Sequence, residues 1–195
     1  MPVKSNFAAG NILTASDTNT YLTNGGLVYI TEATATSGGT LSINNCFSST
    51  YASYVAVCTF ITTTATAYEL CVRFRASGVD TSAGYYTGTT RVDVTTGTSN
   101  VQAGNNASQY GTGCVAANAG RAHAVIQIVN PQLAQYTTFS AQASDTRGAS
   151  GYAGVSSGGT LANTTQYDGL TFGAGPFGTG VISNLQVKVY GYRQA

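Results

Sequence analysis

The sequence predicts an all-β protein, an antiparallel β-sandwich of jelly-roll-like type that follows a short helical segment. Three observations lead to this prediction. Only 8% of the 195 residues are charged, against about 25% in a typical soluble domain, and Thr, Ser, Asn, Gly and 13 Tyr take their place. Apolar and polar residues alternate in several stretches of strand length. Turns rich in Gly and Ser separate these stretches, with no helical pattern between them.

Residues 1–26 have a different pattern from the rest of the chain. Thr14 has the form of a helix N-cap, and Asp17 falls in the first turn. The helix would end near Leu22, before two glycines that can adopt the left-handed C-cap conformation. A helix of about two turns is not stable alone. We therefore expect residues 1–26 to form an attachment segment and residues 27–195 to form the sandwich domain.

Strands are expected at intervals from residue 27 onward. The most regular candidate is 68–75, in which every second residue is apolar, as is typical of a strand with one buried face. In 85–96 we expect Arg91 and Asp93 to point outward. The other candidate strands are 27–33, 41–43, 54–62, 122–129, 136–143 and 181–192.

Two polar stretches, 97–113 and 144–160, are expected to be loops. In a sandwich such loops gather at the ends, where binding surfaces are commonly built. An exposed Tyr beside them would offer a flat apolar ring and a hydroxyl to a sugar or a protein, although these rings could instead pack onto the sandwich end. The candidate receptor-facing residues are Tyr110, Asp145, Arg147 and Tyr152.

Net charge limits the classes of partner. The chain carries a formal charge of +1, whereas nucleic-acid binding needs a basic face and an anionic membrane surface attracts clusters of Lys and Arg. No apolar run approaches the roughly 20 residues of a membrane span, and the first residues lack the apolar core of a secretory signal. We therefore expect that the chain neither binds nucleic acid nor inserts into a membrane. We expect the protein to stay in the cytoplasm or in a particle.

Metal and cofactor chemistry is not expected. The cysteines form no CxxC pattern and His123 is the single histidine, so the ligand pairs of a zinc site are missing. His123 falls within an apolar strand pattern, where we expect it to be packed or hydrogen-bonded. Without a signal peptide, disulfides are not the default. The four thiols, expected to be small buried side chains, are Cys46, Cys58, Cys71 and Cys114.

Two motif matches do not predict catalysis. The G-x-S-x-G match at 154–158 lacks the strand, helix and His partner that a nucleophile elbow needs. The G-x-G-x-x-G match at 173–178 contains a proline and precedes a strand, whereas the dinucleotide fingerprint opens a helix. The seven acidic residues are dispersed, which favours neither a calcium site nor a paired-acid glycosidase site. The chain is predicted not to be an enzyme.

Arg73 and Arg75 form the one cluster of basic residues on a strand. The period of two places both on the same outward face. Such a face can simply be solvated, or it can be a contact between subunits, where Arg is favoured. Both interpretations stay open from the sequence, and the two arginines are the candidate subunit contact.

Two sets of residues resemble bacteriophage virion proteins. The stretch 7–22 resembles the opening of many phage minor structural proteins. The stretches 45–54, 72–78 and 189–193 resemble a β-sandwich domain that recurs in phage tail, fibre and baseplate-associated proteins. The residues that carry the attachment pattern are Phe7, Leu13, Thr14, Asp17, Asn19, Tyr21 and Leu22.

The resemblance implies a virion structural protein, assembled in the host cytoplasm. A tail-associated fibre or baseplate subunit with a host-receptor-binding role is expected first. A capsid-decoration or head-fibre protein is the alternative, and a carbohydrate-binding module or glycan-active enzyme is the alternative from another class. The implied partners are other virion proteins through residues 1–26, further copies of the chain as a homotrimer by analogy with phage fibres, and a host-surface glycan or protein. No cofactor is implied.

Overall fold

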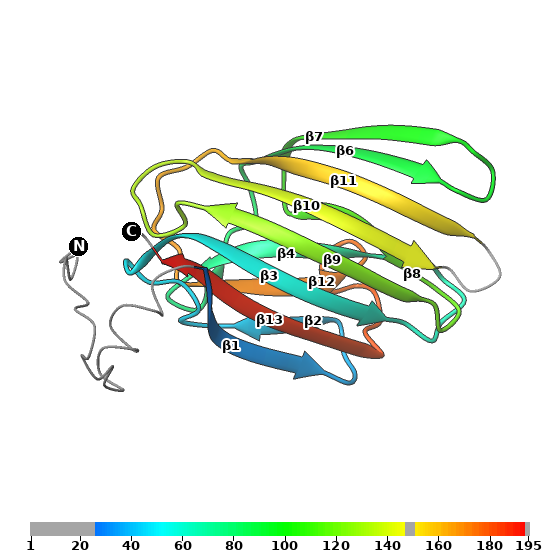
Figure 1. Cartoon of the computed structure of the whole chain (residues 1–195), viewed down its shortest axis with the longest axis horizontal. Helices are drawn as coiled ribbons and strands as arrows, with labels where there is room; N and C mark the ends of the chain where they lie inside the picture. The colour runs from blue at the N-terminus through cyan, green and yellow to red at the C-terminus, as the bar shows by residue number, and fades with distance from the viewer. Residues whose placement is uncertain (1–25, 147–150, 194–195) are drawn as a thin grey trace, which may run out of the picture.

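The computed structural model describes residues 26–146 and 151–193, and in these residues every regular element is a β-strand (Figure 1). Two sheets with antiparallel pairing face each other in a sandwich-like arrangement. The eight-stranded sheet has the order β1 (Leu27–Ala35), β13 (Asn184–Arg193), β3 (Tyr51–Ile61), β9 (Arg121–Val129), β10 (Thr137–Thr146), β11 (Tyr152–Leu161), β6 (Tyr85–Asp93) and β7 (Ser99–Ala107). The second sheet has the order β2 (Thr40–Ile43), β12 (Gly169–Ala174), β4 (Tyr68–Ala76) and β5 (Val79–Asp80), with β8 (Tyr110–Ala116) also paired to β4.

The core lies between the sheets and follows from the period of two. In β9, alanine and isoleucine at every second position are buried and the residues between them are mostly exposed. In β4, Leu70, Val72 and Phe74 are buried in the same way from the other sheet. The Phe74 ring lies 5.7 Å from the ring of Phe139 and 5.4 Å from that of Tyr167, measured between centroids. Each such buried side chain contributes about 1.5–3 kcal/mol of hydrophobic stabilisation.

The predicted all-β class and antiparallel pairing are confirmed, and the candidate strand 68–75 is β4. The expected loops are wrong, because 97–113 contains β7 and most of β8, and 144–160 contains the end of β10 and most of β11. Ladder hydrogen bonds to β6, β4 and β10 hold these Gly-, Ser- and Asn-rich segments extended. The predicted helix lies outside the described residues.

Candidate functional site

The outer face of the eight-stranded sheet is built from rows of side chains that cross five strands. Register places Thr59, His123, Ser144, Gly154 and Val92 side by side in one row. The next row, toward the far end of the sheet, is Val57, Val125, Gln142, Ser156 and Thr90, and the row after it is Val55, Gln127, Ser140, Gly158 and Gly88. Hydroxyl, amide, imidazole and small apolar groups make up these three rows, which contain no Asp, Glu, Lys or Arg.

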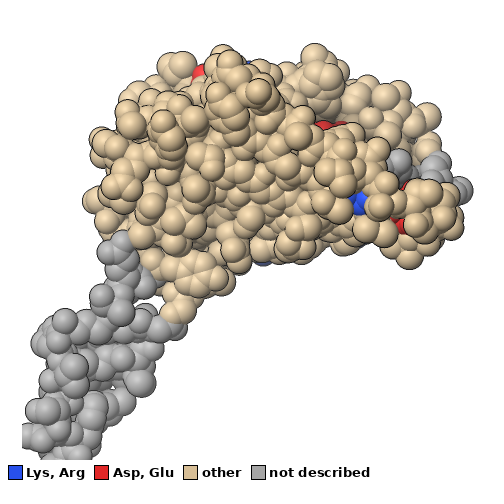
Figure 2. Space-filling model, turned by 90° about the horizontal axis from the view of Figure 1, so that it is seen from above, with Lys and Arg blue, Asp and Glu red and all other residues tan. Residues whose placement is uncertain are grey.

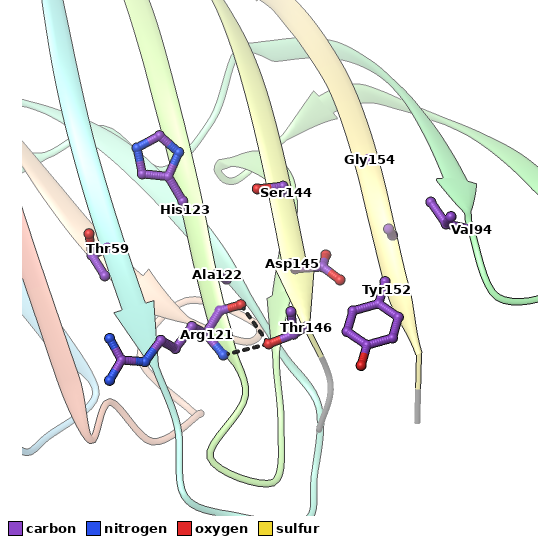
Figure 3. Close-up of a pocket in the computed structure, with 11 residues that line it drawn as sticks. Thr59, Val94, Arg121, Ala122, His123, Ser144, Asp145, Thr146, Tyr152 and Gly154 are labelled. Carbon is purple, nitrogen blue, oxygen red and sulfur yellow. Dashed lines mark hydrogen bonds between the residues drawn. The ribbon is translucent and has the colours of Figure 1, made fainter. Parts of the chain in front are cut away.

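A hollow of about 580 Å³ opens on this face (Figure 3). Arg121 and His123 of β9 lie on one side of it, and Tyr152 of β11 lies on the other. Adjacent strands are about 4.8 Å apart, so β9 and β11 are separated by about 10 Å. The small residues Ser144 and Gly154 leave the space between them open. The hollow is therefore open between β9 and β11, over Ser144 and Gly154.

Backbone and hydroxyl groups fix the end of the hollow. The Arg121 N–H donates to Thr146 Oγ1 at 2.8 Å, and that hydroxyl donates to the Arg121 carbonyl at 3.0 Å. These bonds extend the β9–β10 ladder beyond its last paired residue. The Tyr152 side chain, on the residue paired with Thr146, is 58% exposed. Its ring offers an apolar surface and its hydroxyl a hydrogen bond.

His123 is exposed on this face, so the expectation that it is packed within the apolar strand is wrong. Its neighbours Ala122 and Ala124 face the core, and the period of two turns the imidazole outward. The outward orientation of His123 could have been predicted from the sequence, because small apolar residues flank it at both adjacent positions. Among the described residues, Tyr152 and Asp145 are the predicted receptor-facing residues that line the hollow. Tyr152 is exposed, and its receptor role stays a prediction.

Tyr110 does not face solvent, contrary to the sequence-based expectation. Its side chain is buried, its hydroxyl hydrogen-bonds Ser157 Oγ at 2.6 Å, and its ring centroid lies 4.3 Å from that of Phe139. Burial raises the pKa of the Tyr110 hydroxyl. The residue is buried because β8 passes beneath the eight-stranded sheet, which local sequence does not reveal.

Asp145 is also buried, and the expectation of a receptor-facing loop residue is wrong. Arg91 Nη1 and Nη2 donate to its two carboxylate oxygens at 2.7 and 2.8 Å. The Val115 N–H donates to Asp145 Oδ2 at 3.0 Å, and Arg91 also donates to the Gly113 carbonyl at 2.9 Å. Arg91 was expected to point outward, but it shares the inward face of β6 with Tyr85, six residues earlier. The pair joins the two sheets through β8.

Arg73 and Arg75 both contact their own chain. Arg75 Nη1 donates to Asp80 Oδ1 at 2.7 Å and to Thr171 Oγ1 at 2.5 Å, and Nη2 donates to the Gly78 carbonyl. Arg73 Nε donates to the Ser108 carbonyl at 2.9 Å, and its guanidinium lies 4.0 Å from the centroid of the Phe177 ring. These contacts order both side chains, and a subunit contact here stays a prediction.

The remaining predicted site residues lie outside the described part of the chain. They are Arg147 and the attachment residues Phe7, Leu13, Thr14, Asp17, Asn19, Tyr21 and Leu22. Among the described residues, no group of three or more His, Cys, Asp or Glu side chains could hold a metal ion. No described helix is long and apolar enough to cross a bilayer.

All four cysteines are buried as free thiols. Desolvation raises the pKa of each thiol, that of Cys46 to about 12. A thiolate is the reactive form of cysteine, and these environments disfavour it. The described cysteines are therefore packing residues, as the sequence predicts.

Glycosidase chemistry needs two acids that meet in one cleft. Glu69 and Asp145 both accept hydrogen bonds from the backbone of β8, at Gly113 and Val115. The Asp145 side chain is completely covered and is held by Arg91. Of these two acids, only Glu69 has a partly exposed side chain, so they do not form an open acid pair.

Comparison with protein-family models, with curated proteins and with solved structures finds no match to this chain. Fold and surface are therefore the basis for a functional conclusion. They define an antiparallel, sandwich-like β protein with three rows of uncharged side chains on one sheet face and a shallow hollow, lined in part by Arg121, on the same face.

Proposed function

We propose that this chain is a structural subunit of a bacteriophage virion, carried as a tail-associated fibre or baseplate protein. In this proposal residues 1–26 attach the chain to the particle. The jelly-roll-like sandwich then presents the outer face of its eight-stranded sheet, and the hollow beside Tyr152 contacts a receptor on the host. The observation that carries the proposal is that three rows across the middle of this face carry no charged side chain, while several charged side chains are paired within the chain.

Internal pairing accounts for six of the charged side chains. The pairs are Arg91 with Asp145, Arg75 with Asp80, and Lys188 with Glu32. In the view from above in Figure 2, acidic and basic side chains are a few small spots among uncharged side chains. Like charges on neighbouring copies repel one another. A surface on which several charges are paired within the chain supports close packing of many copies in a particle.

Exposed tyrosines support a contact role for the sheet. Tyr29, Tyr152 and Tyr192 are each at least 42% exposed, and the rings of Tyr29 and Tyr190 pack edge to face across β1 and β13 at 5.9 Å. Tyrosine gives a large contact area at a low cost in side-chain entropy. A capsid-decoration or head-fibre location would use the same attachment segment and the same face, and it is the alternative.

Particle incorporation tests the structural role. Particles are purified from host cells that supply either the full chain or a variant without residues 1–24. We expect the full chain to copurify with particles, and the shortened chain to keep its β-sheet circular dichroism while remaining unbound. Absence of the full chain from purified particles would contradict the proposal. Unfolding of the shortened chain would show instead that the first residues belong to the core.

Adsorption tests the receptor role separately. Ser144→Arg fills the hollow with a long side chain, and the matched control Thr50→Arg adds the same group to an exposed turn before β3. We expect both variants to enter particles, with adsorption to host cells reduced only by Ser144→Arg. Equal adsorption of the two particles would refute a receptor contact at the hollow.

A further inference from the structure

A groove separates the β6–β7 ribbon from β8, on the side of the ribbon opposite the outer face. Two adjoining hollows form it, of about 240 Å³ and about 200 Å³, and they share Glu69, Thr89 and Gln102. Register sets Thr89 opposite Gln102 and Arg91 opposite Asn100. These four side chains lie on one face of the ribbon and line the groove, because they occupy alternate positions of paired strands.

Glycines allow side chains of the groove to pack closely against the backbone. A Cβ atom at Gly111 would lie 2.6 Å from Glu69 Oε1, and one at Gly104 would lie 2.6 Å from Thr87 Oγ1. Gly113 has a φ of +73°, which L side chains rarely adopt. Side chains of the neighbouring strands, among them Glu69, Thr87 and Val155, occupy the room that these glycines leave. One wall of the groove is thus the backbone of β8 with the Glu69 carboxyl of β4, and the other carries the hydroxyl and amide groups of β6 and β7.

Charge in the groove is close to balanced. The guanidinium of Arg91 is bound by Asp145 on two atoms, which leaves it little attraction for an anion. Glu69 Oε1 accepts the Gly113 N–H at 2.6 Å, and burial raises the pKa of this carboxyl. A carboxylate beside a neutralised guanidinium disfavours an anionic ligand. The lining therefore fits an uncharged molecule.

Several hydrogen-bonding groups of the lining have no protein partner. Within the described residues, Glu69 Oε2 and the side-chain groups of Thr89, Asn100 and Gln102 make no hydrogen bond to the chain. Together they offer a carboxylate acceptor, two amides that both donate and accept, and a hydroxyl. A ring that carries several hydroxyl groups can satisfy such a mixed set, whereas an apolar ligand would leave it desolvated without partners.

We propose that this groove binds a neutral pyranose sugar residue. Glu69 and Gln102 hydrogen-bond ring hydroxyls from opposite walls, and Asn100 and Thr89 orient the ring along β6 and β7. Each hollow is smaller than the roughly 300 Å³ of a small drug-sized pocket, which suits one ring at a time. The site goes beyond the proposed function, because it lies apart from the receptor face and does not depend on attachment to a particle.

Titration of the isotope-labelled full chain tests the site. Amide chemical shifts are followed while the methyl glycosides of glucose, galactose, mannose and N-acetylglucosamine are added, with N-acetylneuraminic acid as the acidic comparison. We expect at least one neutral glycoside to shift the amides of Thr89, Gln102 and Gly113. Gln102→Ala removes the hydrogen bonds of one exposed amide and should weaken binding about tenfold.

Val101→Ala is the matched control. Val101 is the neighbouring residue on β7, is 75% exposed and points to the opposite side of the ribbon. Its loss should leave the affinity unchanged. The proposal is overturned if none of the four neutral glycosides shifts the groove amides, if both variants weaken binding equally, or if the acidic sugar binds more tightly than every neutral one. Failure of the chain to enter particles would not alter these results.

Discussion

Asp145→Asn should destabilise the fold strongly, because it removes one partner of an ion pair that joins the sheets. The Asp145 side chain has no exposed surface and that of Arg91 is 16% exposed. Breaking such a buried pair on one side costs about 3–5 kcal/mol, since the other charge stays buried without compensation. The asparagine oxygen can still accept the Val115 N–H, so we expect the lower end, about 3 kcal/mol.

Urea denaturation followed by far-ultraviolet circular dichroism measures this loss. For a chain of this size about 3 kcal/mol corresponds to a fall in Tm of about 6–12 °C. Glu32→Gln is the control, because Glu32 and Lys188 form a half-exposed pair at 3.8 Å that contributes about 0–1 kcal/mol. A free energy of unfolding for Asp145→Asn within 1 kcal/mol of the parent, or an equal loss in both variants, would show that the buried pair does not hold the sheets together.

Two further predictions concern buried titratable groups. Desolvation raises the pKa of Glu69, so the folded state binds this proton more tightly than the unfolded chain. Above its folded pKa, ionised Glu69 therefore lowers the stability of the fold. At pH 8 we expect Glu69→Gln to unfold at a higher urea concentration than the parent, and the difference should shrink as the pH falls through that pKa. A gap that widens on acidification would contradict this sign. All four thiols are buried and have raised pKa values. At pH 8 a thiol reagent should therefore label no cysteine in the native protein and all four in urea. Rapid labelling of the native protein would show that the thiols are accessible.

The strands with regular alternation could be predicted from sequence, and those without it could not. In β4 and β9 apolar residues recur at every second position, so one buried face is evident. In β7 and β11, Ser, Asn and Gly dominate, and their extended conformation depends on hydrogen bonds to β6 and β10. Each of these partners is the preceding strand in the chain. Cross-strand pairing therefore overrides the weak strand propensity of Ser, Asn and Gly.

The candidate sites depended even more on long-range register. His123, Ser144 and Gly154 form one row only because β9, β10 and β11 pair in the observed register. Tyr110 and Asp145 were expected in loops, but β8 crosses under the eight-stranded sheet and buries both. The inward position of Arg91, by contrast, could have been predicted from the sequence. Arg91 follows Tyr85 by six residues, and an even spacing in a strand places both side chains on one face.

Imaging of intact particles tests the central proposal most directly. Antibody fragments raised against residues 27–195 are added to particles purified from cells that carry the gene in its native context, and the complexes are viewed by cryo-electron microscopy. The proposal predicts fragments bound at a fixed position on the tail or baseplate, in symmetric sets, and a capsid position would favour the decoration alternative. Particles that carry no fragment, and that form and infect normally when the gene is deleted, would contradict the assignment to the virion.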